Sequence, residues 1–256
     1  MDKTDERDIA GRVVVITGAG QGIGRQYALA FARAGAIPVI AEINGQGARH
    51  VEAEAKALGV DALAVDLDVA SPESCQKMSA ATLAKFGRID ALINNAAIFS
   101  TLKKAPFDEI ALDDWKRVME VNVTGSYLCA RAVAPSMRSA GYGRIINVSS
   151  SAVRTGTPNY LHYVTSKAAV IGMTNAMARE LGKFGVTVNC IIPSATTTEI
   201  GREGFNATTA AAIASRQCIP RPQTPADIVG LALFLASPAS GYITGQSIAV
   251  NGGLTH

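Results

Sequence analysis

The chain has few of the residues that mark metal-binding, membrane-spanning or nucleic-acid-binding proteins. Its four cysteines lie far apart in 256 residues and form no CxxC pair, so we expect buried thiols rather than a zinc site or redox dithiol, and no bound metal. No apolar run approaches the roughly 20 residues of a membrane span. The longest basic run is Lys103-Lys104, and 24 basic residues face 21 acidic ones. Neither a nucleic-acid nor a membrane partner is expected.

The first residues are polar and of mixed charge, without the apolar core of a secretory signal. We expect a cytoplasmic protein with a polar tail over residues 1–11. The remaining residues, 12–256, are of a length and composition, 48% hydrophobic, that suit one large domain.

Short β-branched runs alternate with longer segments of helical periodicity. One of the helices is predicted to start at Ser71-Pro72-Glu73, where a capping serine, a proline and an early glutamate follow one another. Such alternation predicts an α/β domain with a parallel sheet covered by helices on both faces. The strands are expected at residues 12–17, 37–42, 62–66, 89–94, 144–149, 186–192 and 247–250.

Residues 194–224 show poor periodicity and are rich in Thr, Ala and Pro. They follow the carboxyl end of a predicted strand, which is where ligands bind in open α/β sheets. We interpret this segment as a candidate substrate lid, with a plain surface excursion as the alternative.

A glycine-rich turn, TGAGQGIG at residues 17–24, follows the first strand and opens the first helix. It fits the spacing TGxxxGxG and not GxGxxG. Glycines allow a close approach to a pyrophosphate, and the helix N-terminus offers free N–H groups, so this context indicates phosphate binding rather than a structural turn alone.

Glu42 stands at the end of the second strand, about 20 residues beyond the glycines, where a carboxylate can accept both ribose hydroxyls of an adenosine. A carboxylate there repels a 2′-phosphate, and no basic residue occupies positions 20, 21 or 43 to offset it. NAD(H) is therefore favoured over NADP(H). A solvated glutamate at a strand end remains the alternative.

These segments together resemble the short-chain dehydrogenase/reductase family in its classical form, from about residue 11 to the C-terminus. The matching motifs are TGAGQGIG at 17–24, Asp68-Val69, NNAA at 94–97, Asn122 in EVNVTG, Ser150 in NVSSS, and Tyr163 with Lys167. The resemblance implies a single-domain Rossmann-type, doubly wound seven-stranded sheet in the order 3-2-1-4-5-6-7. It also implies a homotetramer.

The resemblance assigns two sets of residues. The catalytic set is Asn122, Ser150, Tyr163 and Lys167. The expected cofactor-binding set is Gly18, Gln21, Gly22, Ile23, Gly24, Glu42, Asp68, Val69, Asn95, Ala96, Tyr163, Lys167, Pro193, Thr196 and Thr198.

The segment NNAA departs from the family's NNAG in its last position, and the turn after the sixth strand also departs from the family pattern. Pro193 is followed by Ser194 where the family usually has glycine. A side chain there would stand beside the nicotinamide and narrow or polarise the substrate pocket. Together with Ser151, Asn159 and Tyr160, Ser194 is a candidate pocket residue.

The stretch YLHYVTSK at 160–167 contains several possible proton-transfer groups. Tyr163 and Lys167 are four residues apart and share a helix face, whereas Tyr160 is turned away by most of a turn. His162, beside Tyr163, belongs to another face, and we interpret it as packed or exposed rather than as the base.

Tyr163 is the predicted general acid/base. Free tyrosine has a pKa of ~10, and a base near neutrality requires a shift of about three units, or roughly 4 kcal/mol. A lysine ammonium nearby favours the phenolate. Ser150 can hold the substrate oxygen as charge develops on it, and the resemblance implies that Lys167 binds the nicotinamide ribose and Asn122 a water.

The leading functional hypothesis is an NAD(H)-dependent oxidoreductase that interconverts a small, uncharged secondary alcohol and its ketone. The Pro-Ser turn and the ending TGQSIAVNGGLTH weakly resemble bacterial aryl or alicyclic secondary-alcohol dehydrogenases. One alternative is a 3-oxoacyl carrier-protein reductase, which would use NADPH. A non-catalytic nicotinamide-binding regulator is a third hypothesis, against which the complete catalytic set argues.

Overall fold

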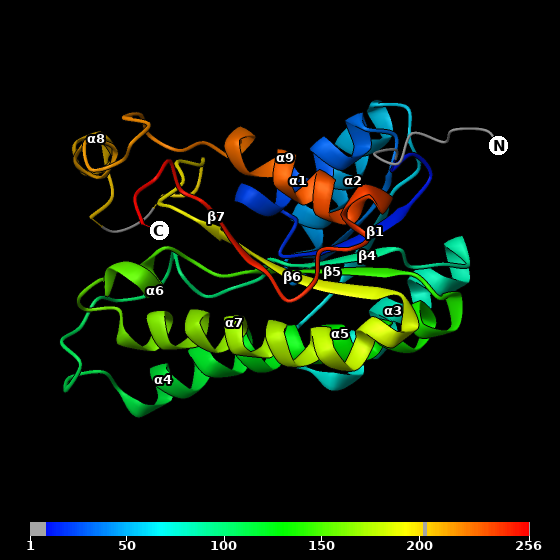
Figure 1. The fold of residues 1–256 in the computed structure, drawn as a ribbon, viewed down its shortest axis with the longest axis horizontal. Helices are drawn as coiled ribbons and strands as arrows, with labels where there is room; N and C mark the ends of the chain where they lie inside the picture. The colour runs from blue at the N-terminus through cyan, green and yellow to red at the C-terminus, as the bar shows by residue number, and fades with distance from the viewer. Residues whose placement is uncertain (1–8, 202–203, 256) are drawn as a thin grey trace.

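The structure is a doubly wound α/β fold, seen in the computed structural model of residues 9–201 and 204–255 (Figure 1). The strands are β1 (Val13–Thr17), β2 (Ile37–Glu42), β3 (Leu63–Asp66), β4 (Ala91–Asn94), β5 (Gly143–Val148), β6 (Val186–Pro193) and β7 (Ser247–Val250). They form a seven-stranded parallel sheet in the order β3-β2-β1-β4-β5-β6-β7. The predicted fold class and strand order are therefore confirmed.

Helices connect the strands. They are α1 (Gly22–Arg33), α2 (Gly45–Ala57), α3 (Pro72–Phe86), α4 (Leu112–Met119), α5 (Gly125–Ala140), α6 (Ala152–Thr155), α7 (Leu161–Leu181), α8 (Ala207–Ala214) and α9 (Ala226–Ala236). A π-helical turn, η1 (Glu120–Thr124), separates α4 from α5, and the 3₁₀ turns η2 (Gly182–Phe184) and η3 (Pro238–Ser240) follow α7 and α9.

The sheet has one hydrophobic cluster on each face. On one face Tyr27 and Phe31 of α1 pack with residues of α2 and α9. On the other, Met78 of α3 and Met137 of α5 pack with residues of α7 (Figure 1). The strands β1, β4, β5 and β6 are buried along their whole length, and their residues form nearly continuous apolar runs instead of alternating, as in a parallel sheet covered on both faces.

The predicted start of α3 is found as expected. The Ser71 hydroxyl accepts a hydrogen bond from the Ser74 N–H, and Pro72 occupies the first turn. This arrangement satisfies one of the N–H groups that have no partner within the helix.

The packed part of the chain begins before the predicted domain boundary. Ile9 is buried in the cluster that contains α1, and the Gly11 N–H donates to the Gly35 carbonyl. The rest of the predicted tail, residues 1–8, lies outside the described residues. In the described ranges no helix is long and apolar enough to cross a membrane.

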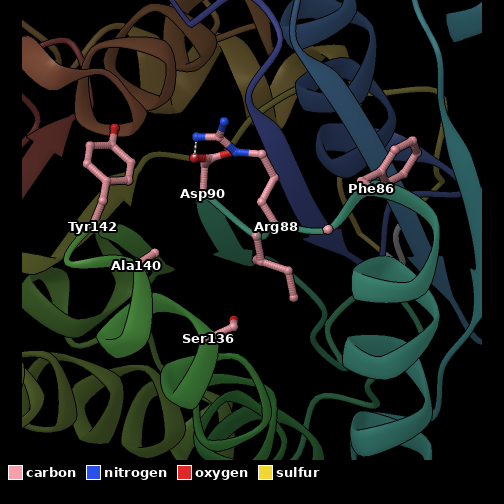
Figure 2. A pocket seen from close by; sticks show the side chains of 8 residues that line it. Phe86, Arg88, Asp90, Ser136, Ala140 and Tyr142 are labelled. Carbon is pink, nitrogen blue, oxygen red and sulfur yellow. Dashed lines mark hydrogen bonds and ion pairs between the residues drawn. The ribbon is translucent and has the colours of Figure 1, made fainter.

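The amino ends of the strands carry a dense set of paired charges. The Asp90 carboxylate, 3% exposed, accepts from the Val13 N–H at 2.8 Å, from Arg88 Nε at 2.7 Å and from Arg12 at 3.3 Å. Asp90 lines a hollow of about 330 Å³ between the ends of α3 and α5 (Figure 2). Since the buried carboxylate is fully bonded, we interpret this end as structural rather than catalytic.

Asp90→Ala is expected to reduce the free energy of unfolding by about 2–4 kcal/mol, because it leaves the buried Val13 N–H without an acceptor and removes the partner of two arginines. Urea unfolding measures the change. Asp113→Ala is the control, since its side chain is 98% exposed and its pair with Lys116 should contribute less than about 1 kcal/mol. Equal losses in the two variants would contradict the assignment.

Candidate active site

The glycine turn is fastened to the end of β4 by Thr17 and Asn95. The Thr17 hydroxyl accepts from the N–H groups of Asn95 and Ala96, each at 3.0 Å. In return, the Asn95 side-chain amide donates to the carbonyls of Thr17 and Gly18. These bonds join β1 and β4 at the carboxyl edge of the sheet, where the strand order reverses.

Two glycines of the turn have no room for a side chain. Gly18 has φ +65, and a Cβ there would stand 2.9 Å from the Ala96 Cα. A Cβ on Gly24 would lie 2.1 Å from the Gly18 carbonyl oxygen, so α1 starts directly against the turn. The result is a bare backbone cradle that ends at a helix N-terminus. These residues fit the diphosphate of a dinucleotide.

The Glu42 carboxylate lies beside this cradle. It is 8% exposed, and it accepts hydrogen bonds from the N–H groups of Gly20, Ile43 and Asn44. A carboxylate oriented in this way by three backbone donors has a fixed position next to the turn. Glu42 therefore lies next to the glycine turn.

Asp68 and Val69 follow β3 at the same edge of the sheet. Asp68 accepts from the Ala70 N–H, and its own N–H donates to the Ser74 hydroxyl. Val69 is buried, and one of its methyl carbons would lie 2.7 Å from a Cβ on Gly125. Both residues are therefore held by α3 and α5 in the region where the resemblance expects an adenine.

Asn122 lies in the π-helical turn η1 and is 1% exposed. Its side-chain oxygen accepts from the Ile98 N–H at 2.8 Å, and its amide donates to the Ser166 hydroxyl at 3.0 Å. The side chain thus connects the segment after β4 to α7. Single π turns within helices are rare and are frequent at functional sites.

Ser150 and Ser149 follow β5 and have separate roles. The Ser149 hydroxyl is buried and donates to the Lys167 carbonyl at 2.8 Å. The Ser150 hydroxyl accepts from the Ala152 N–H at 3.2 Å, a contact that leaves its hydroxyl hydrogen available to a ligand. Ser151 is 5% exposed, and its N–H donates to the Pro193 carbonyl.

Tyr163 is 6% exposed at the first turn of α7. Its ring stacks on Phe99, with centroids 4.4 Å apart and an interplanar angle of 29°. The Lys167 ammonium lies 5.8 Å from the centre of the tyrosine ring. The predicted sharing of one helix face by Tyr163 and Lys167 is thus present.

Lys167 is a buried cation. It is 3% exposed, and its ammonium donates to the Val148 carbonyl at 2.8 Å. Burial lowers the pKa of Lys167 from its ordinary value of 10.5 to about 8. The side chain is therefore still mainly charged at neutral pH, although water has been removed from around it.

The other residues of the 160–167 stretch also surround the pair. The Tyr160 ring lies 6.5 Å from that of Tyr163 and 5.8 Å from Phe99, so it remains beside the site although it precedes the helix. Asn159 has φ +64, a left-handed conformation that asparagine tolerates, and its carbonyl accepts from the Ala105 N–H. His162 is buried, and its Nδ1 has no hydrogen-bond partner.

The segment after β6 is held at its base by Gln223. The Gln223 side-chain oxygen accepts from the Ser194 N–H at 2.8 Å and from the Thr196 hydroxyl at 3.0 Å. Thr196 also forms a β-bridge with Gln223. The beginning and the end of the predicted lid, residues 194–224, are therefore in contact. Thr198 accepts from the Ile200 N–H. Residues 202–203 of this segment lie outside the described residues.

Sequence reasoning missed three residues that the structure brings to this edge. Phe99 stacks on Tyr163, Gln223 supports Ser194, and the Glu199 carboxylate accepts from the Gly22 N–H. Phe99 and Glu199 each come a few residues after a strand, so a search along every strand end could have found them. Gln223 has no such signal.

Comparisons with known proteins agree with this geometry. The family model described as enoyl-(acyl carrier protein) reductase matches residues 18–255. A 3-oxoacyl-[acyl-carrier-protein] reductase from Synechocystis is 38% identical, and the match covers 96% of this chain and 98% of the relative.

Solved structures of similar proteins have the same fold. A short-chain type dehydrogenase/reductase from Mycobacterium marinum has a TM-score of 0.90 and 34% identity, with 98% of each chain covered. A 7α-hydroxysteroid dehydrogenase complexed with NADH and 7-oxo glycochenodeoxycholic acid has a TM-score of 0.92 and 34% identity, with 99% of this chain and 98% of that chain covered.

Lys167→Met is expected to stabilise the cofactor-free protein by roughly 1–2 kcal/mol near pH 7 while it abolishes turnover, because it removes a buried charge. The folded protein releases the Lys167 proton at about pH 8, well before the unfolded chain does. Below that pH the cost of burial is fully present, and above it the native protein regains stability. The advantage of the variant should therefore shrink as the pH rises from about 8 toward 10.5.

Urea unfolding across this pH range measures the effect. Lys103→Met, at an exposed position, should change stability by less than about 0.5 kcal/mol at every pH. A Lys167→Met protein that is less stable than the native one at pH 7 would show that burial of the ammonium is not a cost.

Proposed function

Because the chain belongs to the short-chain dehydrogenase/reductase family, we propose that it is an NAD(H)-dependent oxidoreductase that interconverts a small, uncharged secondary alcohol and its ketone. The observation that carries the proposal is the buried pair of Tyr163 and Lys167 on α7, together with Ser150, which follows the end of β5. A relative of the same family has been solved with NADH and a keto compound.

Tyr163 acts as the general acid/base. In the oxidation direction its phenolate takes the proton of the alcohol hydroxyl as the carbon–oxygen double bond forms. An oxidised nicotinamide dinucleotide held by the glycine turn and Glu42 would supply the acceptor for the hydride that leaves the same carbon. In the reverse direction the Tyr163 hydroxyl returns the proton to the oxygen of the reduced carbonyl.

The neighbours of Tyr163 make this proton transfer feasible. The Lys167 ammonium, held on the Val148 carbonyl, favours the phenolate electrostatically. The Ser150 hydroxyl donates to the substrate oxygen and stabilises the negative charge that develops there. Asn122 fixes the π turn against α7 and so keeps the tyrosine helix and the strand ends in register.

The fixed carboxylate of Glu42 supports the choice of NAD over NADP. Three backbone N–H groups hold it beside the glycine turn, where the family binds the adenosine ribose. A phosphate on that ribose would bring two negative charges together. NADP(H) is the less favoured cofactor.

Two aromatic rings support an apolar substrate of modest size. The rings of Phe99 and Tyr160 cluster with that of Tyr163: their centres lie 4.4 and 6.5 Å from its centre and 5.8 Å from each other. An aryl or alicyclic ring packs favourably against such a wall. We propose that Ser151, Asn159 and Ser194 complete the pocket and that residues 194–224 cover it.

A 3-oxoacyl-[acyl-carrier-protein] reductase is the second candidate, favoured by the 38% identical Synechocystis relative. That activity would show a preference for NADPH and for an acyl group carried on an acidic protein. Turnover of a panel of secondary alcohols and of 3-oxoacyl substrates with both cofactors separates the candidates. As for the assembly and its location, we propose a homotetramer in the cytoplasm.

Tyr163→Phe should lower kcat/KM for secondary alcohols by about 10³-fold while cofactor binding is kept, because the phenol oxygen is the proton acceptor. Tyr160→Phe keeps the aromatic wall and should change kcat/KM by less than about tenfold. Steady-state rates with NAD, and titration of each variant with NADH by fluorescence, test the pair. An inactive Tyr160→Phe beside a normal Tyr163→Phe would show that the wrong base has been chosen.

Glu42→Gln should reduce the preference for NAD over NADP, given as a ratio of kcat/KM values, by about tenfold or more, because it removes the repulsive charge but keeps the shape. Glu42→Ala should have the same direction and also weaken binding of both cofactors, since the glycine turn loses an acceptor. An unchanged ratio, or a native enzyme that prefers NADPH, would refute the role of Glu42.

A further inference from the structure

The glycine turn holds a carboxylate from a distant part of the chain. Oε1 of Glu199, which follows β6, accepts a hydrogen bond from the Gly22 N–H at 2.9 Å. Gly22 is the first residue of α1 and one of the residues expected to bind the cofactor diphosphate. The carboxylate therefore contacts the same donor that a phosphate would use.

This position suits a negative charge. The residue before α1, Gln21, makes no side-chain cap, and the first turn of the helix contains no acidic residue. Exposed N–H groups and the positive end of the helix dipole remain there. Arg25 adds to the field: its pKa is raised, chiefly by its bonds to Glu54 and to a smaller extent by the charge of Glu199. Glu199 thus caps the N-terminus of α1, although it lies outside the helix.

Ile200 closes the turn beside Glu199. Its terminal carbon lies 2.6 Å from where a Cβ on Gly22 would stand, and Gly22 has φ +58. The isoleucine side chain therefore occupies the side of Gly22 where a Cβ would stand. Residues 199–200 thus occupy the surface of the turn that carries the Gly22 N–H.

The contact extends from a firmly held base. The Thr197 N–H donates to the Gln223 carbonyl at 2.9 Å, and Ser194 and Thr196 also bond to Gln223. Glu199 lies two residues beyond this attachment. Displacement of Glu199 therefore moves residues 198–201 and leaves the base of the segment in place.

We propose that Glu199 substitutes for the cofactor diphosphate in the cofactor-free protein, so that it sets cofactor affinity and couples cofactor binding to the movement of residues 198–201. The inference rests on the proposed function, because it takes the glycine turn as the dinucleotide site. A ligand must displace the carboxylate to bind. Its apparent affinity is therefore its intrinsic affinity multiplied by the fraction of protein in which the turn is open.

Glu199→Ala should tighten binding of NAD and of ADP by about tenfold and leave binding of adenosine, which has no phosphate, unchanged. Isothermal titration calorimetry with the full chain measures all three ligands. The same variant should lower the melting temperature of the cofactor-free protein, since α1 loses its cap, but not that of the NAD-saturated protein.

Two further variants separate displacement from simple repulsion. Glu199→Asp keeps the charge but shortens the side chain by one methylene, so it should tighten ADP binding nearly as much as Glu199→Ala. Repulsion alone would leave it like the native protein. Glu180→Ala, at an exposed position of α7, removes the same charge far from the turn and should change no affinity.

The outcomes distinguish the inference from the proposed function. If the native protein binds neither NAD nor NADP, the proposed function is wrong, and this inference with it. If the native protein binds NAD but Glu199→Ala binds it with equal or weaker affinity, the proposed function stands and Glu199 is only a helix cap. A native affinity for ADP in Glu199→Asp would reject displacement in favour of repulsion.

Discussion

The joint between Thr17 and Asn95 is the interaction on which the rest of the site depends. One hydroxyl and one side-chain amide make five hydrogen bonds across the ends of β1 and β4. These bonds hold the glycine turn against β4 and so fix where α1 begins. The segment that continues from Asn95 leads to Ile98, which bonds to Asn122, and to Phe99, which stacks on Tyr163. The cradle and the tyrosine are thereby positioned by one joint.

The two ends of the sheet treat buried charge in opposite ways. At the amino ends the Asp90 carboxylate is bonded to two arginines and a backbone N–H, so its burial is compensated. At the carboxyl ends the Lys167 ammonium is buried and donates to the Val148 carbonyl, and burial lowers its pKa to about 8. Such an incompletely compensated charge reduces stability and is characteristic of functional sites.

Free backbone donors explain why carboxylates gather at the glycine turn. Glu42 bonds to Gly20 from 22 residues away, and Glu199 bonds to Gly22 from 177 residues away. Each satisfies N–H groups that a helix start and a tight turn leave without partners. The same donors attract phosphate, because a helix start offers its N–H groups to any anion.

The sequence by itself determined the alternation of strands and helices and the helix that begins at Ser71, since strand burial and helix capping are local properties of the chain. The strand order was implied by the resemblance to the family. It also determined that Tyr163 and Lys167 share a face, because that follows from helix geometry. Only the tertiary structure decided that Ile9 is buried, that Phe99 stacks on Tyr163, that Gln223 supports Ser194 and that Glu199 reaches Gly22. Those contacts join residues that are remote in sequence, and side chains meet across strand ends only after the sheet has set their distance.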